Sequence, residues 1–105
     1  MADALKRQEK ARILQKPAYL KAVWTERNIM AQLKSPFLCH LVHAFQSDVE
    51  VFLVMPFLQG GDLRYHMSQL RRPMTEDMAR FYAAEIALGL EELHSLHIVY
   101  RDLKP

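Results

Sequence analysis

The sequence predicts a small α+β domain, and three features lead to this fold class. Residues 18–34 contain no glycine or proline and carry apolar side chains at helical spacing. Two apolar runs follow, at residues 37–45 and 51–58, with a polar turn between them. A second helical stretch covers residues 75–97. A sheet with its helix therefore comes first in the chain, and further helices come afterwards.

The charged start of the chain contains only a short strand end. Ala4, Leu5 and Lys6 form that strand end, and residues 6–16 have the basic, polar character of a helix or turn. Pro17 then suits the first turn of a helix, because the N–H that proline lacks would have no acceptor there.

The helix at residues 18–34 carries one apolar stripe. Its members recur three or seven residues apart, which places them on one side of a helix, and they are Leu20, Val23, Met30 and Leu33. Glu26 falls inside this stripe. The helix is expected to end before Ser35, because a residue that precedes a proline disfavours helical backbone.

The two apolar runs are expected to be neighbouring strands joined by a hairpin turn at residues 46–50. The stretch 51–55 is apolar without alternation, which is typical of a strand covered on both faces. Pro56 marks the end of this strand, because proline cannot donate to the ladder.

Three further elements complete the expected order. The glycines at 60–61 interrupt regular structure, and residues 63–70 form a short helix. Thr75 is a good N-cap for the helix at 75–97, whose many apolar positions predict that most of its circumference is buried. Residues 98–100 form a short β-type run.

Composition excludes several classes of function. The chain has 105 residues, of which 50% are hydrophobic and 25% charged, as expected of one globular domain. Its net charge of +2 is too small to indicate nucleic-acid or anionic-membrane binding. Cys39 is the only cysteine, which excludes a disulfide framework and a four-thiolate zinc site and favours a reducing, cytoplasmic setting. The histidines form no metal-binding motif, and no stretch reaches the roughly 18–20 apolar residues of a membrane span.

The most specific string is YRDLKP at residues 100–105. The string resembles the catalytic loop of protein kinases, in the form with tyrosine in place of the commoner histidine. Kinases transfer a phosphoryl group, and this reaction needs a carboxylate beside the incoming hydroxyl and a cation near the transferring group. The resemblance implies that Asp102 is the catalytic base and Lys104 the phosphate partner. The alternative is a surface turn with charged side chains.

Two further residues match the same family. A carboxylate on an apolar stripe must be paired or neutralised, and Glu26 resembles the glutamate of the kinase C helix. Lys6, in the A-x-K pattern 20 residues earlier, resembles the strand lysine that pairs with it. The alternatives are a Glu26 at the stripe edge that reaches solvent, a disordered basic terminus, or pairing with Lys10, Lys16 or Lys21.

Residues 54–63 resemble the strand, gatekeeper and hinge that hold adenine in kinases. Extended backbone offers a C=O and an N–H that match the adenine edge. The resemblance implies that Met55 is the gatekeeper, that the Pro56 C=O and the Leu58 N–H contact adenine, and that Asp62 binds the ribose. The alternative is a simple turn.

Several strings together resemble the AGC group of serine/threonine kinases. They are SPFL at 35–38, GGDL at 60–63 and RFYAAEI at 80–86. The string at 61–66 is similar to the receptor-kinase-like and YANK-like branches of that group. The resemblance covers the chain from the third kinase strand to the catalytic loop.

The resemblance implies a partial protein-kinase-like fold. Residues 1–58 are expected to form part of the N-lobe, 59–62 the hinge and 63–105 part of the C-lobe. The implied activity is transfer of the γ-phosphate of ATP to serine or threonine hydroxyls of a protein substrate, with ATP and Mg²⁺ as cofactors.

The chain lacks parts of the kinase pattern. No Gly-rich loop precedes Lys6, and neither the asparagine of the catalytic loop nor D-F-G follows. Without these Mg²⁺ ligands, we expect this polypeptide to have no appreciable phosphotransferase activity by itself. The alternatives are a non-catalytic interaction module, and a helical structural protein in which Lys6 and Glu26 lie far apart.

Overall fold

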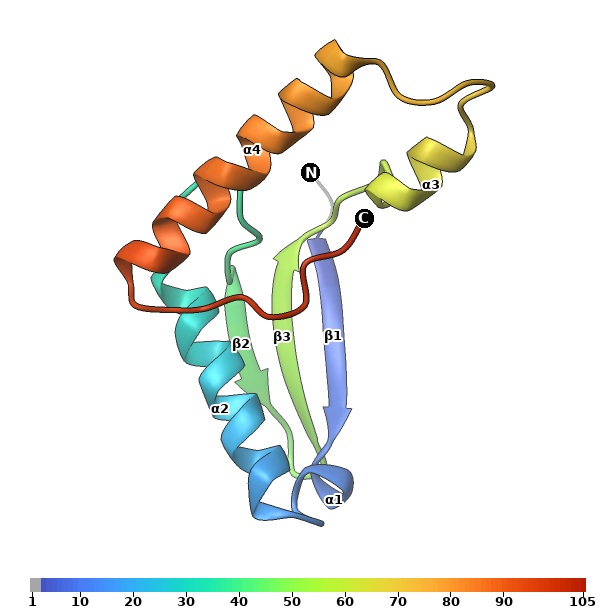
Figure 1. The fold of residues 1–105 in the computed structure, drawn as a ribbon. Coiled ribbons are helices and arrows are strands. Elements are labelled where there is room, and N and C mark those ends of the chain that lie inside the picture. Colours follow the sequence, from blue (N-terminus) through green and yellow to red (C-terminus); the bar gives the residue numbers. More distant parts are fainter. Residues whose placement is uncertain (1–2) are drawn as a thin grey trace. The chain divides into compact units, whose positions relative to one another are not determined.

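The computed structural model describes residues 3–105 of the chain, and its elements confirm the predicted α+β class (Figure 1). The expected N-lobe begins at residue 1, outside the described residues. In chain order the elements are β1 Asp3–Glu9, α1 Lys10–Ile13, α2 Pro17–Gln32, β2 His43–Gln46, β3 Glu50–Pro56, α3 Leu63–Ser68 and α4 Glu76–Ser95.

The chain forms two compact units. The first comprises Met1–Lys34 and Leu38–Phe57, and the second comprises Ser35–Phe37 and Leu58–Pro105. All three strands, α1 and α2 belong to the first unit, whereas α3 and α4 belong to the second.

The sheet of the first unit has three antiparallel strands in the order β1-β3-β2. Leu53 on the central strand stands opposite Lys6 of β1 and opposite Ala44 of β2, so these three side chains share one face. The helix α2 lies on this face (Figure 1). Leu53 is only 1% exposed and is the centre of the core of this unit.

The second face of the sheet is open. Phe45 and Phe52 stack there with ring centroids 4.7 Å apart, and Phe45 remains 52% exposed. Of the residues of β3, only Leu53 is buried. The prediction that residues 51–55 are covered on both faces is therefore wrong for the described chain, because no helix of this unit covers the second face.

The predicted strand at 37–45 is also wrong in its length, since β2 has four residues. The Leu41 N–H donates to the Met30 C=O near the end of α2, at 3.1 Å, and is not available to a ladder. Pairing with β3 begins only at Val42, whose N–H donates to the Val54 C=O at 2.8 Å. The segment before Val42 therefore connects the helix to the sheet and adds no further ladder rungs.

The first strand is longer than expected. It runs to Glu9 instead of ending at Lys6, because every residue of β1 has a partner in β3. Arg7 and Glu50 add an ion pair of 3.1 Å across this edge. The Lys10 N–H, at the start of α1, then donates to the Val49 C=O at 2.9 Å.

The helices of the second unit begin as the sequence predicts. The Thr75 hydroxyl oxygen accepts a hydrogen bond from the Met78 N–H at 3.2 Å, which confirms the N-cap of α4. At the other end, His97 has a φ of 60°, and the Ile98 N–H donates to the Leu93 C=O at 2.8 Å. This arrangement satisfies a terminal carbonyl of the helix.

Two predictions for this unit are wrong. Residues 98–100 form no strand, because the Ile98 N–H caps α4, and Val99 is 71% exposed. Most of the circumference of α4 is exposed, and only Gly89 and Leu93 are buried. The apolar face of α4 has no covering element within this unit. Among the described residues, no helix is long and apolar enough to cross a membrane.

Candidate active site

The structure brings Lys6 and Glu26 together. Lys6 lies in the middle of β1, and its ammonium donates to both carboxylate oxygens of Glu26 on α2, at 2.9 Å and 3.1 Å. Glu26 lies three residues after Val23 and four before Met30, which places it on the side of α2 that faces the sheet. Both oxygens are therefore held by one cation.

This ion pair positions the two groups and adds little to stability. The Lys6 side chain is 43% exposed and that of Glu26 is 36% exposed. Ion pairs so open to water typically contribute about 0–1 kcal/mol to the free energy of unfolding. The ion pair does, however, fix the position of the Lys6 ammonium relative to β1.

The competing lysines do not pair with Glu26. Lys16 lies over the ring of Tyr19, 5.5 Å from its centroid. Lys10 lines an apolar hollow of the first unit that Glu26 does not line. Lys21 makes no ion pair with the described residues. The structure thus distinguishes Lys6 from every other lysine weighed for this role.

The expected adenine-binding segment starts in the sheet and leaves it. Met55 is partly buried and stands opposite Ala4 of β1, while Pro56 is the last residue of β3. Leu58 lies beyond the strand and is 72% exposed. Their contacts with adenine remain predictions.

Asp62 is also the N-cap of α3, a role that the sequence analysis did not predict. Its Oδ1 accepts a hydrogen bond from the Tyr65 N–H at 2.8 Å and caps α3. The signal was available, because aspartate directly before a helical stretch is a preferred N-cap. The second oxygen, Oδ2, makes no hydrogen bond or ion pair with the described residues.

A groove of about 650 Å³ in the second unit gathers three of the predicted residues. Asp62, Asp102 and Lys104 all line it, and the Lys104 ammonium lies 3.2 Å from Oδ2 of Asp102. Both side chains of this ion pair are about three-quarters exposed, at 73% and 75%. The groove therefore places the proposed base and a cation in direct contact.

Glu85 lines the same groove and was not among the predicted residues. It is partly buried on α4, next to Ile86 and one turn after Tyr82. A carboxylate between apolar positions is the signal that singled out Glu26, and it would have found Glu85 as well. The groove is lined by three carboxylates, those of Asp62, Glu85 and Asp102, and by Lys104 as its one cation. Within residues 3–105, no group of three or more potential ligands is arranged to hold a metal ion.

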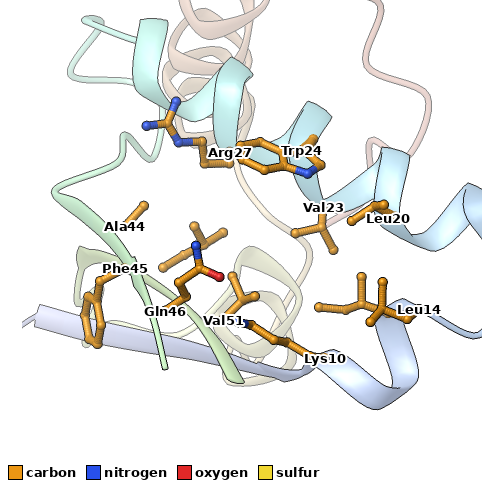
Figure 2. Close-up of a pocket in the computed structure, with 12 residues that line it drawn as sticks. Lys10, Leu14, Leu20, Val23, Trp24, Arg27, Ala44, Phe45, Gln46 and Val51 are labelled. Atoms are coloured by element: carbon orange, nitrogen blue, oxygen red, sulfur yellow. The ribbon is translucent and has the colours of Figure 1, made fainter. Parts of the chain in front are cut away.

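The first unit contains a separate apolar hollow of about 370 Å³ (Figure 2). Leu20, Val23 and Trp24 of α2 line one side, and Leu14 and Val51 line the other (Figure 2). None of the predicted site residues lines it. This apolar hollow is thus distinct from the residues expected to carry chemistry.

Cys39 does not have the properties of a reactive nucleophile. The thiol is partly buried, and burial raises its pKa above the ordinary value because the thiolate is disfavoured away from water. A thiol with a raised pKa is less available for attack at neutral pH.

Comparison with known proteins identifies a family and several relatives. Residues 2–105 match the family described as protein kinase domain. The chain is 51% identical over 80 residues to a putative ribosomal protein S6 kinase alpha-1 of Caenorhabditis elegans, covering 76% of this chain and 10% of that protein. It is 47% identical over 100 residues to serine/threonine-protein kinase Sgk1 of Homo sapiens, covering 90% and 23%. It is 41% identical over 102 residues to ribosomal protein S6 kinase beta of Caenorhabditis elegans, covering 97% and 18%. The chain therefore spans less than a quarter of each of these relatives.

Proposed function

This chain belongs to the protein kinase domain family, and we propose that it supplies the phosphate-facing lysine and the catalytic loop of a protein that phosphorylates serine and threonine hydroxyls. The predicted kinase family and its AGC group are confirmed by the family match and by the S6 kinase and Sgk1 relatives. The receptor-kinase-like or YANK-like branch remains a prediction.

The Lys6–Glu26 ion pair is the observation that carries this proposal. Two residues 20 positions apart, one in a strand and one in a helix, meet at 2.9 Å. In the proposed reaction the Lys6 ammonium binds phosphate oxygens of ATP, and Glu26 fixes its position. A preorganised cation lowers the cost of bringing negative phosphates into the site.

The second unit supplies the proposed proton acceptor. Asp102 takes the proton of the substrate hydroxyl, and Lys104, 3.2 Å away, offsets negative charge on the transferring group. Asp62 can cap α3 through Oδ1 and still offer Oδ2 to a ribose hydroxyl, because the two oxygens are independent acceptors. Met55 with the backbone of Pro56 and Leu58 is proposed to hold the adenine.

The ATP and Mg²⁺ that the family uses would supply the reactive phosphoryl group and neutralise its charge. Lys6 fits the phosphate end of ATP. Asp102 fits the substrate hydroxyl that accepts the phosphoryl group. In this family the asparagine of the catalytic loop and the aspartate of D-F-G hold Mg²⁺, and the 105 residues contain neither D-F-G nor that asparagine. We therefore propose that the 105-residue polypeptide has no appreciable phosphotransferase activity by itself, and that the activity belongs to the longer protein. We also propose that the substrate is a protein and that the longer protein acts in the cytoplasm.

The test is phosphoryl transfer by the full-length protein to a serine- or threonine-containing peptide. We expect Asp102→Asn to lower kcat by about 10²–10⁴-fold, the usual contribution of a positioned acid or base. Asp48→Asn, in the exposed hairpin turn of the first unit, is the matched control and should leave kcat unchanged. Equal activity of the Asp102→Asn variant and the parent protein would refute the proposed role.

The second candidate function is a non-catalytic interaction module. The exposed apolar side chains of α4 favour it, since Phe81 is 60% exposed and Leu88 is 44% exposed. Full-length protein that is folded but transfers no phosphate under any condition would support the module over the enzyme.

A further inference from the structure

The segment between α3 and α4 is exposed and irregular. Residues 70–75 have neither helix nor strand structure, and all of them except Met74 are exposed. Arg71 and Arg72 form no ion pair with the described residues. Arg71 and Arg72 lie in a bend, and Pro73 after them keeps Arg72 out of helical backbone.

Thr75 ends this segment, three residues after Arg72 and four after Arg71. Its side chain is exposed, and its hydroxyl oxygen accepts from the Met78 N–H. The hydroxyl donates no hydrogen bond to the described residues. The hydroxyl is therefore accessible, and its proton is not tied to the backbone.

The other hydroxyls of the chain lack this combination. The chain has six serine and threonine residues, and only Thr75 follows a pair of arginines. Ser68 has Arg64 four residues before it, but its hydroxyl donates to the Tyr65 C=O at 2.6 Å within α3. Ser95 likewise donates to the Glu92 C=O at 2.6 Å.

We propose that Thr75 is a phosphorylation site for a serine/threonine kinase that requires arginine on the amino-terminal side of its acceptor. Such an enzyme recognises guanidinium groups with carboxylates, in charge-assisted, often bidentate hydrogen bonds. When the modifying enzyme binds this irregular segment in extended form, Arg72 lies roughly 10 Å from Thr75, so the arginine can be bound while the hydroxyl enters the catalytic centre. This inference concerns the chain as a substrate and goes beyond its own proposed activity.

The transfer step is balanced with ATP as co-reactant. The Thr75 hydroxyl oxygen forms a bond to the γ-phosphorus, and the bond from that phosphorus to the oxygen bridging to the β-phosphate breaks. The hydroxyl proton passes to the catalytic base of the modifying kinase, and ADP leaves.

The neighbouring carboxylates favour an arginine-directed kinase over an acid-directed one. Glu76 and Asp77 follow Thr75, but Arg80 lies 3.6 Å and 3.5 Å from their carboxylate oxygens. These acidic groups are thus partly neutralised within the chain, whereas Arg71 and Arg72 are free to bind a partner.

The experiment exposes the full-length protein to a purified arginine-directed serine/threonine kinase with MgATP and locates the phosphate by mass spectrometry. We expect phosphate on Thr75. The double variant Arg71→Ala/Arg72→Ala should slow its incorporation by about ten- to hundredfold, since a hydrogen bond to a charged group contributes about 1.5–3 kcal/mol. Arg64→Ala is the matched control and should have no effect on Thr75.

Two further variants keep the test independent of folding. Thr75→Ser retains both the helix cap and an acceptor hydroxyl, and it should be modified, whereas Thr75→Ala should not. The proposal is overturned if Thr75 stays unmodified, if the arginine double variant is modified as fast as the parent protein, or if only an acid-directed kinase modifies Thr75.

Discussion

The ammonium of Lys6 lies 2.9 Å and 3.1 Å from the two carboxylate oxygens of Glu26. β1 supplies the cation and α2 the anion, so the pair connects the sheet to the helix that covers it. Because both side chains are partly exposed, the pair should contribute little to the free energy of unfolding, even though we propose that it contributes to ATP binding. The first prediction depends on this difference.

Replacing Glu26 by glutamine should barely affect stability. We expect Glu26→Gln to lower the free energy of unfolding by less than about 1 kcal/mol, because the ion pair is half exposed to water. Leu53→Ala should lower it by about 2–5 kcal/mol, because Leu53 is the fully buried centre of the first unit. Denaturant unfolding of the full-length protein measures both. A loss for Glu26→Gln as large as that for Leu53→Ala would contradict the account.

The cap of α4 gives a second prediction. Thr75→Ala removes the acceptor for the Met78 N–H and should destabilise the start of the helix by about 1 kcal/mol. Thr75→Ser keeps an acceptor and should cost much less. Amide hydrogen exchange at Met78 checks this, with faster exchange expected only in the alanine variant. Equal protection in both variants would show that the cap contributes nothing.

The exposed apolar face of α4 predicts self-association of the 105-residue chain. Phe81 is 60% exposed and Leu88 is 44% exposed, and neither is covered within its unit. We expect Phe81→Lys to reduce association, which sedimentation velocity can measure, whereas Arg80→Lys on the same helix should not. A monodisperse monomer with a cooperative thermal transition before any substitution would contradict this prediction.

Cys39 gives a prediction about pH. Burial raises the pKa of its thiol, so the native thiol ionises at higher pH than the thiol of the unfolded chain. The stability linked to this group is fully present below the pKa of the unfolded thiol and is lost as pH rises through the higher native pKa. Alkylation of the native protein by iodoacetamide should therefore accelerate at higher pH than alkylation of a free cysteine. Superimposable pH profiles would contradict this.

The helices could be predicted because their signals are local. Pro17 and Thr75 each act within one turn, and both helices begin where these residues indicate. Glu26 could be recognised as a residue in need of a cation because it interrupts an apolar stripe. The choice of Lys6 among several lysines came from the family resemblance, and its contact with Glu26 is seen only in the folded chain.

The strands were less predictable because a strand needs a partner. Residues 98–100 have β-type composition, but the Ile98 N–H is used by the end of α4. The strand expected at 37–45 is shortened because the Leu41 N–H donates to a helix carbonyl. Both errors arise from hydrogen bonds between segments, which composition alone does not reveal.

The candidate site departs from the prediction at two residues, one for a local reason and one for a tertiary reason. Asp62 was expected to bind a ribose, and its role as the cap of α3 was overlooked although the local signal was present. Glu85 was overlooked because it lies within a stretch assigned to the core, and only folding brings it to the groove that contains Asp102.

A double-mutant cycle on ATP affinity tests the central claim most directly. The full-length protein is titrated with ATP in the presence of Mg²⁺ as the parent and as Lys6→Met, Glu26→Gln and the double variant, with Lys10→Met as control. If Glu26 acts by positioning Lys6, each single variant should weaken binding by about tenfold or more, and the double variant should be no weaker than Lys6→Met alone. Losses that simply add, or affinity that is unchanged in Lys6→Met, would contradict the account.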